Sequence, residues 1–158
     1  MGSETKITPH ILIVEARFYP EISDQLSRGA TAALSKSGAT FERVQVPGAM
    51  EIPAAIRFAV KNMEMFGGAD RFHGFVALGC VIRGETDHYE HVCRSCLGGI
   101  QALAGEYALA IGTGVLTVEN MKQASERASP DKRNKGGAAA MACLDLLQLK
   151  DRFGLLRE

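Results

Sequence analysis

The sequence predicts an α/β fold built around a parallel β-sheet, on the strength of two observations. Short runs of apolar residues such as 11–14 (ILIV) and 75–82 (FVALGCVI) have the continuity of strands that are buried on both faces. These runs alternate with longer segments whose apolar positions recur at helical spacing. Strand followed by helix, several times over, favours a parallel sheet with helical crossovers. Such sheets bind ligands beyond the carboxyl ends of their strands.

The first half of the chain has clear start and stop signals. Pro20 opens a helix, because proline suits a first helical position, and Gly38 ends it. Residues 40–46 (TFERVQV) alternate between apolar and polar, which predicts a strand near an edge of the sheet. The predicted elements of this half are strand 11–14, helix 20–38, strand 40–46, a turn at Pro47-Gly48, helix 52–68 and strand 73–80.

The second half continues the alternation. Asn134 can cap a last, alanine-rich helix, and the polar segment 129–133 separates it from the helix before. Gly98 and Gly99 lie inside a predicted helix, where each costs about 1 kcal/mol relative to alanine, so they indicate close approach of another backbone. The predicted elements are a helix through 92–107, strand 108–118, helix 119–128 and helix 134–152.

Composition limits the class of protein. A chain of 158 residues predicts one domain, here 10–158 after a flexible polar tail at 1–9. Eighteen acidic residues balance 18 lysines and arginines, so neither nucleic acid nor a membrane surface is an expected partner. No apolar run approaches the length of a membrane span, and the start lacks the pattern of a signal peptide. With four cysteines in no disulfide pattern, we expect a cytoplasmic protein.

The stretch 78–92 (LGCVIRGETDHYEHV) has the features of a binding turn between a strand and a helix. Gly84, Glu85 and Thr86 precede the helix, where free backbone N–H groups and the helix dipole favour an anion; Thr86 and Asp87 also offer capping oxygens. His88 follows at once and can transfer protons near pH 7. The structural alternatives are an ordinary capped helix start and a surface histidine.

Further candidate residues follow the other strands. The segment 47–51 (PGAME) offers backbone amides and a carboxylate to a polar heterocycle or polyol, although it is also an ordinary turn. Phe18 could stack on a ring or pack locally. Arg127 and the basic group Lys132, Arg133 and Lys135 could hold a phosphate or form a solvated face.

Cys93-x-x-Cys96, with His91 nearby, has the composition of a zinc or dithiol site. The spacing is unsuitable for a metal, because consecutive helical residues point in different directions. A redox pair normally lies at the start of a helix, where the dipole lowers the thiol pKa. This pair lies about two turns further on, so two core thiols are the favoured interpretation.

Six segments occur in one order along the chain: ARF (16–18), VPGAMEIP (46–53), LGCVIRGETDHYEHV (78–92), GVLTVEN (114–120), QASERA (123–128) and NKGGAAA (134–140). Together they resemble the lumazine synthase family of riboflavin biosynthesis, over about residues 11–153. The resemblance implies a flavodoxin-like three-layer fold, with a four-stranded parallel sheet flanked by helices. It also implies pentamers or multiples of them, and no metal or organic cofactor. Riboflavin synthase is a candidate protein partner.

The implied transferase reaction condenses 5-amino-6-(D-ribitylamino)uracil with 3,4-dihydroxy-2-butanone 4-phosphate. The products are 6,7-dimethyl-8-ribityllumazine, phosphate and water. By the resemblance, His88 moves protons. The residues implied to bind the uracil and its ribityl chain are Phe18, Ala49, Met50, Glu51, Cys80, Val81 and Ile82, and those implied to bind the phosphate are Glu85, Thr86 and Arg127.

The chain departs from the family at Thr113. The family usually has an aromatic residue there, which reaches the uracil site of the neighbouring subunit. Threonine cannot cover a ring as phenylalanine does, so weaker pyrimidine binding or a changed ligand preference is expected. The alternative function is therefore a catalytically weak relative that mainly binds flavin or lumazine.

Overall fold

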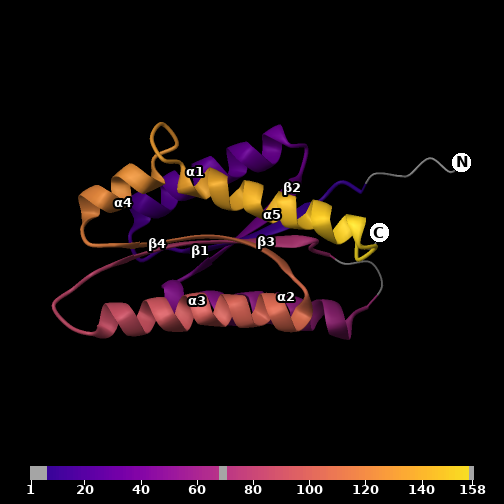
Figure 1. Ribbon diagram of the computed structural model, residues 1–158, viewed down its shortest axis with the longest axis horizontal. Helices are drawn as coiled ribbons and strands as arrows, with labels where there is room; N and C mark the ends of the chain where they lie inside the picture. Colours follow the sequence, from indigo (N-terminus) through magenta and orange to yellow (C-terminus); the bar gives the residue numbers. More distant parts are fainter. Residues whose placement is uncertain (1–6, 68–70, 157–158) are drawn as a thin grey trace, which may run out of the picture.

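The computed structural model describes residues 7–67 and 71–156, which form a parallel sheet between two layers of helices (Figure 1). The strands are β1 (His10–Ala16), β2 (Thr40–Val46), β3 (Gly74–Ile82) and β4 (Ala110–Val118). The helices are α1 (Pro20–Lys36), the short 3-10 helix η1 (Ala49–Glu51), α2 (Ile52–Met65), α3 (His88–Tyr107), α4 (Met121–Ala128) and α5 (Lys135–Arg152).

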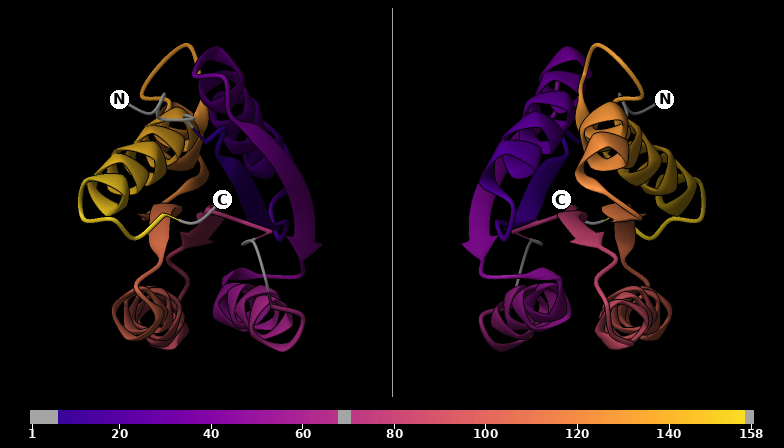
Figure 2. Two further views of the ribbon diagram at one scale, coloured as in Figure 1. Left: turned by 90° about the vertical axis from the view of Figure 1, so that its right-hand side faces the viewer. Right: turned by 90° about the vertical axis from the view of Figure 1, so that its left-hand side faces the viewer.

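The layers confirm the predicted fold class. Helices α1, α4 and α5 cover one face of the sheet, and α2 and α3 cover the other (Figure 2). The strand order is β2-β1-β3-β4 and all neighbours are parallel. This is the order of the first four strands of a flavodoxin-like sheet, with a switch in direction between β1 and β3. A ligand is therefore expected where β1 and β3 end.

The central strands are buried on both faces, which explains their continuous apolar runs. On β1, Ile11 and Ile13 pack under the α1–α5 layer, whereas Leu12 and Val14 face the α2–α3 layer. Where β4 meets α5, Gly112 allows close contact, because a Cβ atom there would meet the backbone of Ala139. The predicted strands thus owe their stability to two cores, one on each side of the sheet.

Several predicted boundaries shift by a few residues, for local reasons. Strand β3 extends to Ile82 rather than residue 80, because it pairs with β4 as far as Val118. Strand β4 begins at Ala110, since Ala108 ends α3 in the left-handed conformation at φ 52°. Helix α4 begins at Met121, after its N-cap Asn120 rather than at residue 119.

The helix ends predicted from Pro20 and Asn134 are confirmed. Pro20 is the first residue of α1, and Asn134 caps α5 by accepting a hydrogen bond from the Gly137 amide at 3.2 Å. Strand β2 is an edge strand as predicted. Across residues 7–67 and 71–156, no helix has the length and apolarity needed to cross a membrane. The predicted tail at 1–9 and the end of helix 52–68 fall partly outside the described residues, and the domain limits stay predictions.

Candidate functional site

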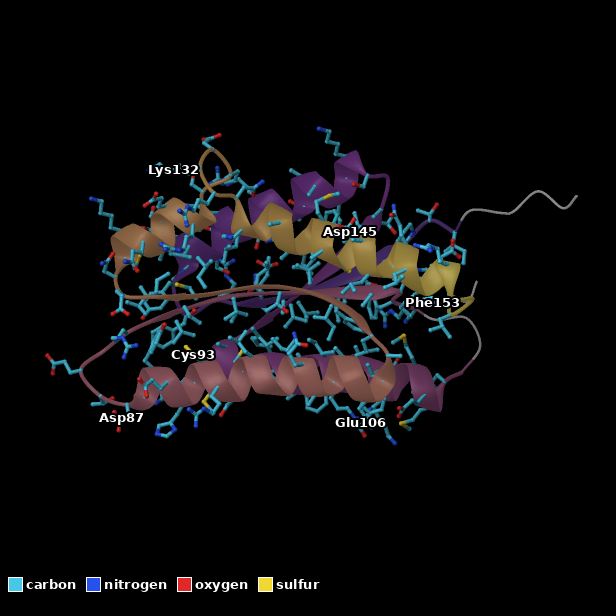
Figure 3. The ribbon with its side chains drawn as sticks, in the orientation of Figure 1. Asp87, Cys93, Glu106, Lys132, Asp145 and Phe153 are labelled. Atoms are coloured by element: carbon cyan, nitrogen blue, oxygen red, sulfur yellow. The ribbon has the colours of Figure 1, made fainter. Side chains whose placement is uncertain are left out.

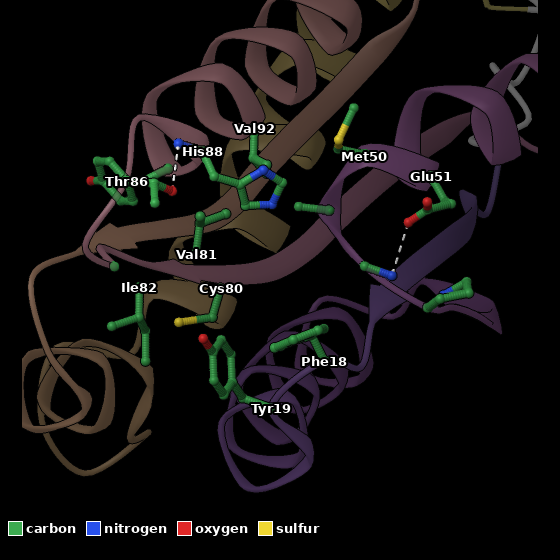
Figure 4. A pocket seen from close by; sticks show the side chains of 15 residues that line it. Phe18, Tyr19, Met50, Glu51, Cys80, Val81, Ile82, Thr86, His88 and Val92 are labelled. Carbon is green, nitrogen blue, oxygen red and sulfur yellow. Dashed lines mark hydrogen bonds between the residues drawn. The ribbon is translucent and has the colours of Figure 1, made fainter.

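A cavity of about 420 Å³ lies beyond the carboxyl ends of β1 and β3, at the predicted switch point (Figure 4). Four segments form its walls: the β1–α1 loop, the loop into η1, the end of β3 and the start of α3. Its lining residues are Phe18, Tyr19, Pro47, Gly48, Ala49, Met50, Glu51, Cys80, Val81, Ile82, Gly84, Thr86, His88, Tyr89 and Val92. Most of the predicted site residues therefore meet in one place.

Two aromatic residues form the wall beside α1. Phe18 is 71% exposed, and its only described ring neighbour is Tyr19, whose ring it meets edge-on at 5.0 Å between centroids. The Tyr19 carbonyl accepts a hydrogen bond from the Ser23 amide at 3.0 Å, which fixes the loop onto the first turn of α1. An exposed ring on a fixed loop is well placed to stack on a planar ligand.

The segment 47–51 is more regular than the predicted turn. Ala49–Glu51 forms the 3-10 helix η1, and Oε2 of Glu51 accepts a hydrogen bond from the Gly48 amide at 3.0 Å. Ala49 is buried, whereas Met50 is 52% exposed at the cavity. The first N–H groups of such a helix have no partner within it, so they are available to polar groups of a ligand.

The end of β3 forms a largely apolar wall. Cys80 is buried, and Val81 and Ile82 are half-buried and paired with β4. Burial raises the pKa of Cys80 to about 11, so the thiol is neutral at neutral pH. Cys80 therefore lacks the character of an activated nucleophile.

Of the two capping residues predicted in the turn before α3, Thr86 forms a side-chain hydrogen bond and Asp87 does not. Oγ1 of Thr86 accepts a hydrogen bond from the His88 amide at 3.3 Å. Asp87, expected to offer a capping oxygen, lies where the loop joins α3 and makes no side-chain cap bond (Figure 3). Gly84 and Thr86 line the cavity, whereas the exposed Glu85 side chain does not.

His88 is the first residue of α3 and is exposed. Its imidazole lies on the α3 side of the cavity, with Phe18 and Tyr19 on the opposite side (Figure 4). A ligand between these walls would have a proton-transfer group on one side and an aromatic face on the other. Tyr89, the next residue, lies under the Arg83 guanidinium, 4.4 Å from the ring centroid.

Two predicted residues lie away from the cavity of their own chain. Thr113 is in the middle of β4, paired with Ala77, well before the strand ends. Arg127 is on α4, where its Nη1 donates to the Gln123 carbonyl at 3.4 Å. The described residues that line the cavity include no lysine or arginine. Lys132, in the predicted basic group, lies beyond the α1–α5 layer (Figure 3).

Sequence reasoning did not assign Tyr19, Tyr89 or Val92 to the site. Tyr19 and Tyr89 each follow a predicted site residue, Phe18 and His88. The available signal is an aromatic residue next to a predicted site residue in the segment between a parallel strand and the following helix. Val92 packs in the core between the sheet and the α2–α3 layer and also borders the cavity.

The two cysteines of the CxxC pattern have the character of core thiols. Burial raises the pKa of Cys93, and raises that of Cys96 to about 11, the opposite of what a redox pair needs. Both are free cysteines, and Cys96 is fully buried. Within residues 7–67 and 71–156, no three His, Cys, Asp or Glu side chains are grouped so that they could hold a metal ion.

Comparison with known proteins gives a consistent result. The model of the 6,7-dimethyl-8-ribityllumazine synthase family matches residues 8–151. The 6,7-dimethyl-8-ribityllumazine synthase of Bartonella bacilliformis is 52% identical over 154 residues, 98% of each chain. The enzyme named 6,7-dimethyl-8-ribityllumazine synthase 1 of Rhizobium meliloti is 51% identical over 94% of this chain and 97% of its own. The 6,7-dimethyl-8-ribityllumazine synthase of Paramagnetospirillum magneticum is 47% identical over 92% of this chain and 97% of its own. Matching along nearly its whole length, this chain belongs to the 6,7-dimethyl-8-ribityllumazine synthase family.

Proposed function

We propose that this chain is a transferase of riboflavin biosynthesis that condenses 5-amino-6-(D-ribitylamino)uracil with 3,4-dihydroxy-2-butanone 4-phosphate. The products are 6,7-dimethyl-8-ribityllumazine, phosphate and water. The observation that carries the proposal is the meeting, in one cavity, of the exposed Phe18 ring, the Gly84–Thr86 turn and the His88 imidazole. Membership of the family over residues 8–151 supports it.

The pyrimidine occupies the part of the cavity beside Phe18. Its ring stacks on Phe18, and the strand end 80–82 supplies backbone groups at the ring edge. The ribityl chain extends toward η1, where Ala49, Met50 and Glu51 offer amides and a carboxylate. Glu51 is the one carboxylate in the described lining, which suits it to the hydroxyl groups of the ribityl chain.

The phosphate lies at the start of α3. Helix N-terminal amides and the Thr86 hydroxyl favour an anion there, and Glu85 contributes only its backbone because its side chain does not line the cavity. The described lining lacks a cation, so the countercharge has to come from elsewhere. We assign it to Arg127 of a neighbouring copy, together with Thr113 from the same copy.

His88 moves protons as the reaction proceeds. The substrate amine attacks the ketone and water is lost to give an imine; phosphate then leaves, and a second dehydration closes the ring. Each step moves protons that an imidazole at the cavity wall can accept and return. The nucleophile belongs to the substrate, in agreement with the raised pKa of Cys80, and holding both substrates together supplies much of the acceleration.

A site shared between copies requires an oligomer, and we propose pentamers or multiples of them. A second cavity of about 370 Å³ follows the edge strand β2 and helix α2, and Phe58 in its lining is 72% exposed. An apolar groove beside an unpaired edge strand favours contact with another copy. Sedimentation velocity tests this: a species of five chains or a multiple is expected, and a monomer that retains full activity would contradict the shared site.

The decisive test of the reaction is turnover. Purified protein mixed with the two substrates should form the lumazine, seen by its absorbance and fluorescence, far faster than the uncatalysed mixture. Tight flavin binding without rate enhancement would instead favour the binding-only alternative, which the names of the relatives do not support. The four free thiols fit the reducing cytoplasm, and riboflavin synthase is the partner to test by co-sedimentation.

A further inference from the structure

A buried carboxylate with no part in the proposed chemistry lies just behind the Phe18 wall. Glu15, near the end of β1, is 0% exposed. Its Oε2 accepts a hydrogen bond from Nε of Arg43 at 2.6 Å, and its Oε1 accepts from Nη2 of Arg43 at 3.0 Å and from Nη1 of Arg17 at 3.3 Å. The Ser27 hydroxyl of α1 also donates to Oε1. One carboxylate thus joins β2, α1 and the β1–α1 loop.

This carboxylate keeps its charge. Burial by itself raises the pKa of Glu15, but the hydrogen bonds from Arg43 and Ser27 and the two arginine charges outweigh it and hold the pKa below its ordinary value. A buried ion pair gains little stability compared with an apolar core of the same shape. What the arrangement does supply is a fixed geometry for the groups that it holds.

Arg17 connects the Glu15 carboxylate to the cavity, because Arg17 contacts Glu15 and precedes Phe18 in the cavity lining. Its Nη2 donates to Oδ1 of Asp24 at 2.6 Å, and its backbone amide donates to the Val46 carbonyl at 3.1 Å. Two residues further on, the Tyr19 carbonyl accepts from the Ser23 amide. The backbone is therefore anchored on both sides of the one residue between Arg17 and Tyr19, which is Phe18.

The Phe18 ring has little packing of its own, because it is 71% exposed and meets only the edge of Tyr19 among described rings. Its position is therefore set by the backbone on either side. We propose that Glu15 and Arg17 are positioning residues for the pyrimidine: Glu15 holds the Arg17 guanidinium, and Arg17 holds the Phe18 ring at the stacking position. This inference rests on the proposed function of the cavity.

The first test compares three variants. In Arg17→Met the Glu15 carboxylate retains Arg43 and Ser27, so this variant should fold even where Glu15→Gln does not. We expect both to raise the KM for the pyrimidine about tenfold, because small misplacements of a substrate-positioning group have effects of this order, with less than about twofold change in the KM for the butanone phosphate. The matched control is Glu42→Gln, which breaks ion pairs with Arg71 and His10 near the amino ends of the strands. Glu42 also lines the second cavity, so sedimentation first checks that assembly is that of the parent chain; with assembly intact, both KM values should be unchanged.

The second test asks whether Arg17 acts through Phe18. In a double-mutant cycle, adding Arg17→Met to Phe18→Ala should leave the pyrimidine KM at the value for Phe18→Ala alone, because there is no ring left to position. A merely structural role for Arg17 predicts instead that the two effects multiply. An unchanged pyrimidine KM in Arg17→Met, or multiplicative effects in the double variant, would overturn the proposal.

A third measurement does not depend on the reaction. Amide hydrogen exchange of residues 17–23 should be faster in Arg17→Met than in the parent chain and unchanged in Glu42→Gln. A parent chain with no turnover would refute the proposed function, while the exchange rates would still test the anchoring. An active parent whose Arg17→Met variant has unchanged exchange would refute the positioning role alone.

Discussion

The two helix layers of this chain are built differently. In the α1–α5 layer the helices approach so closely that a Cβ atom on Gly136 would meet backbone atoms of Leu26, and α5 buries seven of its 18 residues. In the α2–α3 layer, α3 buries only three of its 20 residues, and Phe58 of α2 is 72% exposed. We call the α1–α5 layer the closed layer, because its helices pack against one another within the chain. We call the α2–α3 layer the open layer, because much of its surface is available to other molecules.

The difference separates stability from function. Where α5 meets α1, the closed layer packs small residues against backbone, so substitutions at that contact should change the free energy of unfolding and leave turnover per folded chain intact. The open layer supplies His88 and its helix start to the cavity and presents the apolar groove beside β2. Substitutions there should change turnover, binding or assembly.

The substitution Gly136→Ala should disturb the packing of the closed layer most directly. A Cβ atom at this buried position would overlap the backbone of Leu26, which cannot move aside as a side chain can. We expect a loss of about 3 kcal/mol in the free energy of unfolding, at the upper end for overpacked sites, measured by urea denaturation. Ala138→Ser, at an exposed position of the same turn, is the control and should stay within about 0.5 kcal/mol. Equal stability of the two variants would contradict close packing of α5 on α1.

The open layer is tested by His88→Ala. We expect kcat to fall about 10- to 100-fold, because proton transfer is lost while the substrates are still held together. The free energy of unfolding and the sedimentation coefficient should not change, since His88 is exposed. His91→Ala is the matched control, because His91 lies on the same helix start, exposed and outside the cavity lining. A kcat that is the same for both variants would remove His88 from the mechanism.

The sequence predicts best what depends on neighbours along the chain. The run 11–14 predicts a doubly buried strand, and Pro20 and Asn134 predict their helix starts. The site follows from the same logic, because the carboxyl ends of parallel strands converge, bringing Phe18 and His88 to one cavity.

Features set by contacts distant in sequence were not predictable in this way. The end of β3 at Ile82 depends on pairing with Val118 of β4. The predicted strand 11–14 leaves Glu15 outside it. Glu15 lies inside β1 and is buried, because Arg43 forms an ion pair with its carboxylate and the Ser27 hydroxyl donates a hydrogen bond to it. Neither partner is adjacent to it in sequence, so nothing local distinguished Glu15 from a solvated carboxylate.

The substitution Thr113→Phe tests whether Thr113 contributes to the substrate site of a neighbouring copy. It lies on the face of β4 toward α2 and α3, between Ile111 and Val115, and is half-buried. If it reaches the uracil of a neighbouring copy, Thr113→Phe should add an aromatic contact and lower the KM for the pyrimidine about two- to tenfold. The KM for the butanone phosphate, measured alongside, should not change. An unchanged or raised KM for the pyrimidine would count against this placement.

The smallest expected effect comes from Gly98, the counterpart of Gly136 in the open layer. The predicted approach of another backbone to Gly98-Gly99 is not found: a Cβ atom on Gly99 would crowd the side chain of Pro53, and a Cβ atom on Gly98 would have no described atom of another element within 4 Å. Gly98→Ala should therefore raise the free energy of unfolding by about 1 kcal/mol, the helix propensity difference, opposite in sign to Gly136→Ala. Urea denaturation and sedimentation of the same samples measure stability and assembly together. A loss of assembly would mean that a second copy lies against α3 at Gly98, so that this part of the open layer is closed by the oligomer.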